Sequence, residues 1–170
     1  MLDRLLTILD VPNRAEMRFG GVSPEEVGLP ENLTLHPDAA EYLETCIPIY
    51  EGKHEHPNWC GISQFEMYWK NDLLLAADSF ASDPTRLLAR HGFVPLGNRD
   101  GDQFAIDVVT AEFYEFDHTI GYFEDGFTII YGPGKSTRFA PTRENLCNTA
   151  GKHGTIDHVI EDALSSQSQG

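Results

Sequence analysis

Three side chains that commonly bind zinc lie close together in the polar segment 51–61, EGKHEHPNWCG: His54, His56 and Cys60. A structural zinc site needs four protein ligands, and no second cluster supplies the missing one at a recognisable spacing. We therefore interpret the segment as a solvated loop and predict no metal ligand. A small metal-binding protein or enzyme that uses these three residues is kept as an alternative. Trp59, in the same loop, is either an aromatic anchor for a partner or a core side chain.

The sequence GPGKS at 132–136 looks like the end of a phosphate-binding loop. Such a loop requires a glycine five residues before Gly134, and that position is Ile129, inside a predicted strand. The following residues, 137–141, do not begin a helix whose N-terminus would face a phosphate. We interpret the motif as a turn after a strand and predict no bound cofactor.

Oxygen-bearing side chains alternate at Asn98, Asp100 and Asp102, as they do in a calcium-binding loop. The rest of that pattern is missing, because Gln103 stands where the glycine is required and Val109 where the bidentate glutamate is required. A turn between two strands is the preferred interpretation of this segment.

Two pairs of residues could supply a nucleophile and a base: Cys147 with His153, and Asp117 with His118. Neither pair comes with a third orienting group or with an oxyanion-hole motif. We therefore predict no catalytic residue and expect that the protein is not an enzyme.

The chain is strongly acidic. Its 170 residues include 12 lysines and arginines against 27 aspartates and glutamates, for a formal net charge of −15. Such a field repels nucleic acids and anionic membranes and attracts basic proteins. The simplest alternative is an acidic surface that only keeps the protein in solution. We predict a basic protein partner, and no nucleic-acid or membrane partner.

The cysteines and the first 14 residues of the chain give information on where in the cell the protein is located. Three widely separated cysteines argue against a disulfide framework and for reduced thiols. The apolar stretch of the first 14 residues is interrupted by charges, so it is neither a signal peptide nor a membrane span. These features favour a cytoplasmic location. The sequence does not indicate the oligomeric state.

Acidic residues are concentrated in the segment 97–131, which holds eight of them against one arginine, Arg99. Aromatic residues are interleaved with the acids, so that in alternating strands one set faces the core and the other meets solvent. We expect an acidic sheet surface that binds a basic partner, although acidic side chains that merely prevent sheet edges from pairing would give the same pattern. The predicted partner-binding residues are Asp100, Asp107, Glu112, Glu115, Asp117 and Glu124.

Helix signals precede and follow this segment. Leucines at spacings of three and four predict a short helix before Pro12, and Ser23-Pro24-Glu25-Glu26 has the spacing of a capping box around a single turn. Further helices are predicted over 37–46, from Asp83-Pro84 to His91-Gly92, and over 156–164.

Strand signals dominate the middle of the chain. Residues 65–69 alternate, residues 73–77 fit a helix or a strand, and Asp125-Gly126 indicates a hairpin. The clearest runs predict three or four antiparallel strands at 93–96, 104–109, 111–116 and 127–131.

The stretch LARHGFVPLGNRDGDQFAIDVV, followed by FYEFDH, resembles the central signature of the SUKH superfamily. The resemblance extends from Leu88 to Tyr131. It implies a small, non-enzymatic α+β fold. Many bacterial members are immunity proteins that neutralise a toxin, often a nuclease, and fungal relatives act as interaction scaffolds in cell-wall signalling. The residues that match are Gly97, Gly101, Asp102, Asp107, Asp117 and His118.

Together these features predict an α+β protein with a central, mainly antiparallel sheet flanked by helices. We expect a single SUKH-like domain over 1–165 and a disordered tail over 166–170. The predicted function is that of an immunity-type protein that neutralises a basic toxin through an acidic sheet surface. An intracellular scaffold or regulatory module is the main alternative.

Overall fold

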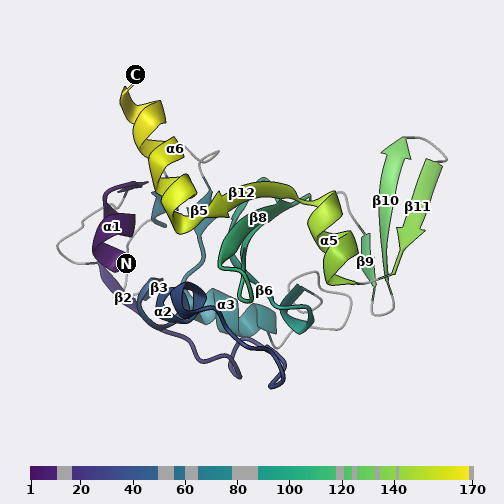
Figure 1. The fold of residues 1–170 in the computed structure, drawn as a ribbon, viewed down its shortest axis with the longest axis horizontal. Coiled ribbons are helices and arrows are strands. Elements are labelled where there is room, and N and C mark those ends of the chain that lie inside the picture. Colours follow the sequence, from purple (N-terminus) through teal and green to yellow (C-terminus); the bar gives the residue numbers. More distant parts are fainter. Residues whose placement is uncertain are drawn as a thin grey trace.

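A seven-stranded antiparallel sheet forms around the aromatic and β-branched runs of the sequence (Figure 1). The computed structural model describes residues 1–10, 17–49, 56–59, 65–77, 88–117, 121–123, 126–132, 135–140 and 142–168. In spatial order, the strands are β1 (Leu9–Asp10), β4 (Asn58–Trp59), β5 (Glu66–Met67), β6 (Phe93–Arg99), β7 (Asp102–Asp107), β8 (Glu112–Phe116) and β12 (Gly151–Thr155).

Two smaller sheets accompany the large one. Strands β2 (Arg18–Gly20) and β3 (Ile47–Ile49) pair near the N-terminus, and β10 (Gly126–Gly132) pairs with both β9 (Gly121–Phe123) and β11 (Lys135–Phe139). The GPGKS motif includes the end of β10 and the start of β11, where Gly132 pairs with Lys135, and its residues 133 and 134 lie outside the described residues. Lys135 thus begins a strand where the lysine of a phosphate-binding loop would begin a helix.

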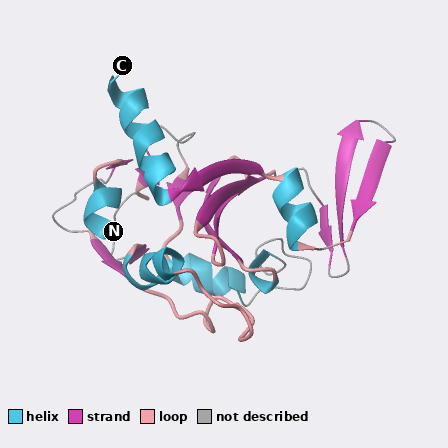
Figure 2. Cartoon of the chain, in the orientation of Figure 1, coloured by secondary structure: helices cyan, strands magenta, loops and turns pink. Residues whose placement is uncertain are grey.

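Five labelled helices are present among the described residues and are cyan in Figure 2. They are α1 (Leu2–Leu6), α2 (Pro37–Thr45), α3 (Lys70–Ala77), α5 (Arg143–Thr149) and α6 (Ile156–Ser168), and residues 88–90 are also helical. Helices α1, α2 and α6 begin where the sequence signals them. Helix α2 has proline at its first turn, and the His36 Nδ1 atom accepts a hydrogen bond from the Asp38 backbone N–H at 3.1 Å. The ambiguous segment 73–77 is part of a helix, and Gly92, at φ +87°, follows the helical residues 88–90.

Both faces of the large sheet are buried, each against a different hydrophobic cluster. One face packs against α1, α2 and α6, and the other packs against residues 88–90 and α5. The strand residues of the first face include Phe104, Ile106 and Phe113. Those of the second include Phe93, Ala105, Tyr114 and Phe116. A residue's place in the strand alternation therefore decides which of the two clusters it faces.

A two-residue turn joins β6 to β7. Arg99 pairs with Asp102, and both residues between them have positive φ, +51° at Asp100 and +93° at Gly101. This is the geometry of a type I′ hairpin turn, for which Asp-Gly is a preferred sequence. The Asn98 Oδ1 atom accepts a hydrogen bond from the Gly101 N–H at 3.4 Å. The alternating oxygens therefore belong to a turn between strands, as predicted.

The prediction of an α+β, single-domain fold with a mainly antiparallel sheet is confirmed. Helix α5 and the strands β1, β2, β3, β4, β11 and β12 were not predicted from the sequence. Helix α6 continues to Ser168, so residues 166–168 are helical and not part of a disordered tail. Residues 83–87, the first half of the helix predicted from Asp83, lie outside the described residues. No helix in the described part of the chain has the length and apolar character needed to cross a membrane.

Candidate functional site

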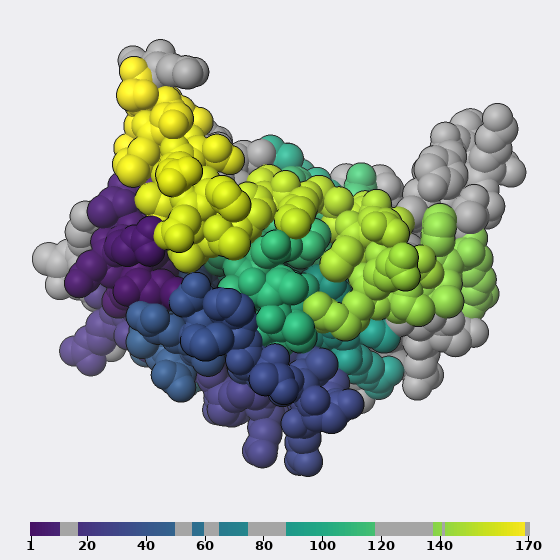
Figure 3. All heavy atoms as spheres, viewed as in Figure 1, coloured from purple at the N-terminus to yellow at the C-terminus, as the bar shows by residue number. Residues whose placement is uncertain are grey.

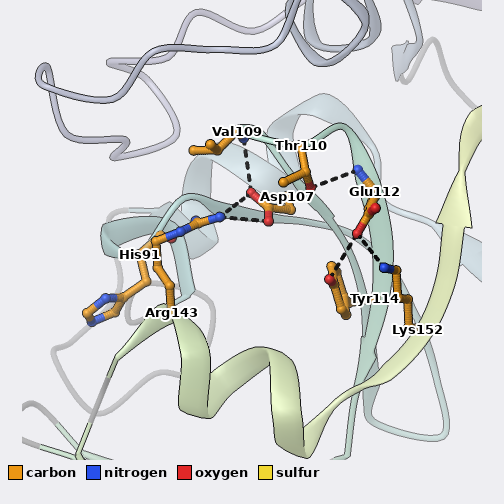
Figure 4. Close-up of polar contacts among 8 residues, drawn as sticks. All are labelled: His91, Asp107, Val109, Thr110, Glu112, Tyr114, Arg143 and Lys152. Atoms are coloured by element: carbon orange, nitrogen blue, oxygen red, sulfur yellow. Dashed lines mark hydrogen bonds and ion pairs between the residues drawn. The ribbon is translucent and has the colours of Figure 1, made fainter.

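Asp107, at the end of β7, is buried and bound by an arginine from α5 (Figure 4). Its side chain is 2% exposed, and the Arg143 Nη2 atom lies 2.7 Å from both carboxylate oxygens. The Val109 N–H donates a further hydrogen bond to Asp107 Oδ1 at 3.0 Å. The prediction that Asp107 meets a partner in solvent is therefore wrong, because the carboxylate is enclosed and its charge is neutralised within the molecule.

Arg143 is held in place by contacts of its own. Its Nη1 atom donates to the carbonyl oxygen of His91, and the guanidinium carbon lies 4.9 Å from the centroid of the Phe93 ring. Thr142 caps α5 by accepting a hydrogen bond from the Asn145 N–H at 3.1 Å, which fixes the start of the helix that carries Arg143. The arginine thus joins α5 to the end of β7 and to the residue that precedes Gly92.

Glu112 is the second predicted residue with partners inside the molecule (Figure 4). Its Oε2 atom lies 3.0 Å from the Lys152 ammonium nitrogen and accepts a hydrogen bond from the Tyr114 hydroxyl at 3.1 Å. Burial, followed by the hydrogen bond with Cys147, raises the pKa of the Tyr114 phenol, so this hydroxyl stays a donor. These contacts join β8 to β12.

Glu115 lies on the opposite face of the sheet from Glu112. It pairs with Phe104 across the strands, whereas Glu112 pairs with Asp107. Its carboxylate binds Arg99 at 3.1 Å and His153 at 3.2 Å. The predicted residues therefore do not form one acidic face, because the alternation of β8 separates Glu112 from Glu115.

The same alternation separates a possible nucleophile from its base. Cys147 packs in the cluster with Tyr114, on the face that α5 covers. The ring of His153 lies 5.6 Å from that of Phe104, on the other face. The sheet stands between the two side chains, so Cys147 and His153 do not form a catalytic pair. His118, the other candidate base, lies outside the described residues.

The remaining predicted residues that the structure describes lie at one end of the sheet. Asp100 is exposed in the β6–β7 turn, and Asp117 is exposed directly after β8. Because neighbouring strands are antiparallel, the start of β7 and the end of β8 meet at this end: Gln103 pairs with Phe116. Glu124 lies outside the described residues.

Sequence reasoning missed an exposed carboxylate at the same end of the sheet. Glu66 of β5 pairs with Asn98 of β6 and is exposed. A hollow of about 180 Å³ lies beside these two residues, and Asp72 also contributes to its wall. The remaining residues that line it are His56, Met67 and Tyr68. The alternation of residues 65–69 did place Glu66 on the polar side of a predicted strand, but the candidates were chosen only from the acidic segment 97–131.

The three residues considered as alternative zinc ligands are only partly described. His54 and Cys60 lie outside the described residues. The His56 Nδ1 atom is 2.8 Å from the Met67 carbonyl oxygen, and its ring packs 5.0 Å from that of Trp69. Among the described residues, no three histidines, cysteines or carboxylates are grouped so that they could bind a metal ion. Trp59 is fully buried, so it is a core side chain and not an exposed anchor.

Comparison of the chain with protein-family models, with curated proteins and with solved structures found no match.

Proposed function

We propose that this chain is a non-enzymatic protein-binding module that docks a basic protein against the acidic end of its central sheet. In its specific form, the proposal is an immunity-type protein that neutralises a basic toxin. The resemblance of residues 88–131 to the SUKH signature supports that form. The acidic end is defined as Glu66, Asp72, Asp100 and Asp117.

One observation carries the proposal: exposed carboxylates from β5, α3, the β6–β7 turn and the end of β8 lie at one end of the sheet. All four side chains of the acidic end are exposed. Asp107, Glu112 and Glu115 each have a cationic partner within 3.2 Å. The surface that can attract a basic protein is therefore narrower than the sequence suggested.

The hollow beside Glu66 is a place in the acidic end where a side chain of a partner could insert. At about 180 Å³ it is too small for a drug-sized ligand, whose pockets are typically about 300–1,000 Å³. It has room for the end of a long side chain such as lysine or arginine. Such a cation would lie near the carboxylates of Glu66 and Asp72, which line the hollow.

The test uses a double variant that removes two charges from the acidic end, Glu66→Gln with Asp100→Asn. Its matched control is Glu161→Gln with Asp162→Asn, which removes two exposed charges from α6. A partner is first captured from host lysate by the immobilised chain and identified. Its association rate with each protein is then measured at low and at physiological salt.

We expect the acidic-end variant to slow association several-fold at low salt, and the α6 control to have a much smaller effect. In the immunity form of the proposal, co-expression of the chain also relieves the toxicity of the captured protein. A partner that binds both variants equally fast at every salt concentration would contradict the electrostatic proposal. A partner whose toxicity is not relieved would contradict the immunity form alone.

A further inference from the structure

A groove of about 430 Å³ lies between two consecutive turns of the segment 23–35. This segment, coloured indigo, forms part of the lower edge of the molecule in Figure 3. The floor and walls are mainly apolar and the charged residues are both acidic. The groove is lined by Ser23, Pro24, Glu25, Leu29, Pro30, Glu31, Leu33 and Leu35.

The first turn is built by a capping box. The Ser23 N–H donates to Glu26 Oε2 at 2.7 Å, and the Glu26 N–H donates back to the Ser23 hydroxyl at 3.2 Å. The Leu29 N–H bonds the Pro24 carbonyl at 3.0 Å and closes the turn. The carboxylate of Glu26 is therefore occupied by the backbone. That of Glu25 lies exposed on the rim.

The second turn is anchored to the sheet. The Leu33 N–H bonds the Pro30 carbonyl at 3.3 Å, and the His36 N–H donates to the carbonyl of Val108, just after β7, at 2.7 Å. Prolines at the start of both turns restrict the backbone, so the walls are set before anything binds. Glu31 lies exposed on the rim of this turn.

The groove and the acidic end are separate surfaces. Val108 follows the last residue of β7, whereas Asp100 precedes its first residue. Six residues of strand span about 20 Å, so Asp100 lies more than a Debye length from the point where the second turn is anchored, and the groove and the hollow beside Glu66 have no lining residue in common. A ligand of the groove therefore does not depend on the function proposed for the acidic end.

We infer that this groove binds an extended segment of a partner protein in which one apolar side chain is flanked by lysines or arginines. The volume and the leucine walls fit an aliphatic or aromatic side chain, since such pockets bind mainly through apolar burial. Glu25 and Glu31, from the two turns, supply charges that complement basic neighbours. A second copy of the chain is a poor occupant, because its net charge is −15.

The experiment titrates the ¹⁵N-labelled full chain with the synthetic peptide acetyl-Lys-Lys-Leu-Lys-Lys-amide and follows backbone amide shifts by NMR. One comparison peptide replaces leucine by serine, and another replaces the four lysines by serines. We expect the first peptide to shift amides within 23–35. Each replacement should weaken binding about tenfold, through lost apolar burial in one case and lost charge pairing in the other.

The protein variant is Glu25→Gln with Glu31→Gln, which alters two exposed side chains and should leave the fold intact. We expect it to weaken binding of the lysine peptide about fourfold. The control Glu161→Gln with Asp162→Asn, of equal charge, should change affinity less than twofold. If only the Glu66→Gln, Asp100→Asn variant lost peptide binding, the binding site would be the acidic end. That result would overturn the inference for the groove.

Three other results would overturn it. Shifts confined to regions outside 23–35 would exclude the groove as the site. Equal binding of the leucine and serine peptides would remove the apolar side chain from the recognition. Shifts of amides 23–35 that depend on protein concentration without peptide would show that a second copy of the chain is the occupant.

Discussion

The Asp107 carboxylate and the Arg143 guanidinium form an enclosed ion pair that joins the end of β7 to the first residue of α5. Asp107 is 2% exposed and Arg143 is 32% exposed, so the arginine reaches solvent while the carboxylate does not. An aspartate in the middle of an acidic segment therefore serves the fold and not the surface. A cluster of acidic residues in a sequence therefore does not establish that their side chains are exposed on the surface.

Replacing Asp107 by asparagine should destabilise the fold, because it leaves the Arg143 charge without its partner. We expect the free energy of unfolding to fall by about 2–4 kcal/mol, below the full cost of a broken buried pair since Arg143 is partly exposed. Chemical denaturation measures this change. Asp100→Asn, in the exposed turn, is the control and should change stability by less than about 0.5 kcal/mol. A similar effect of both substitutions would show that the ion pair adds no stability.

Gly97 allows β5 and β6 to approach closely. A Cβ atom at this position would lie 2.2 Å from the Glu66 carbonyl oxygen, a backbone atom that cannot move without separating the strands. We expect Gly97→Ala to lower the free energy of unfolding by more than about 2 kcal/mol. Gly151→Ala is the matched control, because its Cβ would meet only atoms at 3.8 Å and 3.9 Å. Equal stability of the two variants in thermal unfolding would contradict this explanation.

The structure explains why three residues of the stretch 88–131 are of the type found there. Gly97 permits a close strand approach, Gly101 has the positive φ of a type I′ turn, and Asp107 binds Arg143. Their types follow from backbone geometry and ion pairing within this chain. They are explained without reference to a partner.

The elements predicted from the sequence were those with strong local signals. Strands β6, β7, β8 and β10 are rich in aromatic and β-branched residues, and α2 has a clear start at His36-Pro37. Strand β12, with the sequence GKHGT, has no apolar side chain, and it forms because the edge of β8 offers it backbone hydrogen bonds. Helix α5 buries only Leu146 and shows no apolar periodicity. These elements depend on tertiary pairing, which local patterns do not contain.

The candidate site was predicted less well than the fold, for a specific reason. The alternation of β8 correctly places Glu112 and Phe113 on opposite faces of the sheet. The prediction of an acidic surface also assumed that one of these faces is exposed to water. Because clusters cover both faces, Glu112 and Glu115 are both half-buried, on opposite sides, and each needs a cation. The cations come from other strands, Lys152 on β12 and Arg99 on β6. The exposed positions are instead turns and strand ends such as Asp100.

The pKa of His91 is lowered, first by burial and then by the positive charges of Arg143 and Arg90. In the unfolded chain the pKa of His91 has its ordinary value of 6.5. At pH values below 6.5 the His91 side chain therefore takes up a proton more readily in the unfolded chain than in the folded one. The stability that His91 contributes is therefore complete above pH 6.5 and is lost as the pH falls through the lower folded pKa. We expect His91→Gln to flatten the decrease in unfolding free energy between pH 7 and pH 5.5. If denaturant titrations gave the same pH dependence of the unfolding free energy for the variant and the unmodified chain, His91 would not contribute to that dependence.

Tyr42 and Trp59 pack together in the core with their polar atoms unsatisfied. Both side chains are fully buried, their rings stack at 6.4 Å, and within the described part of the chain neither the Tyr42 hydroxyl nor Trp59 Nε1 has a hydrogen-bond partner. A buried hydroxyl without a partner costs about 1–3 kcal/mol, so Tyr42→Phe should leave the free energy of unfolding unchanged or raise it by about 1 kcal/mol.

Tyr68→Phe is the matched control for this substitution, because the Tyr68 hydroxyl donates to Gln103 Oε1 at 2.7 Å. Removing that hydroxyl should lower the free energy of unfolding by about 0.5–1.5 kcal/mol, so the same chemical change has opposite signs at the two sites. Urea denaturation of both variants beside the unmodified chain measures the difference. If Tyr42→Phe destabilised the protein as much as Tyr68→Phe, an enclosed water molecule would have to satisfy the Tyr42 hydroxyl.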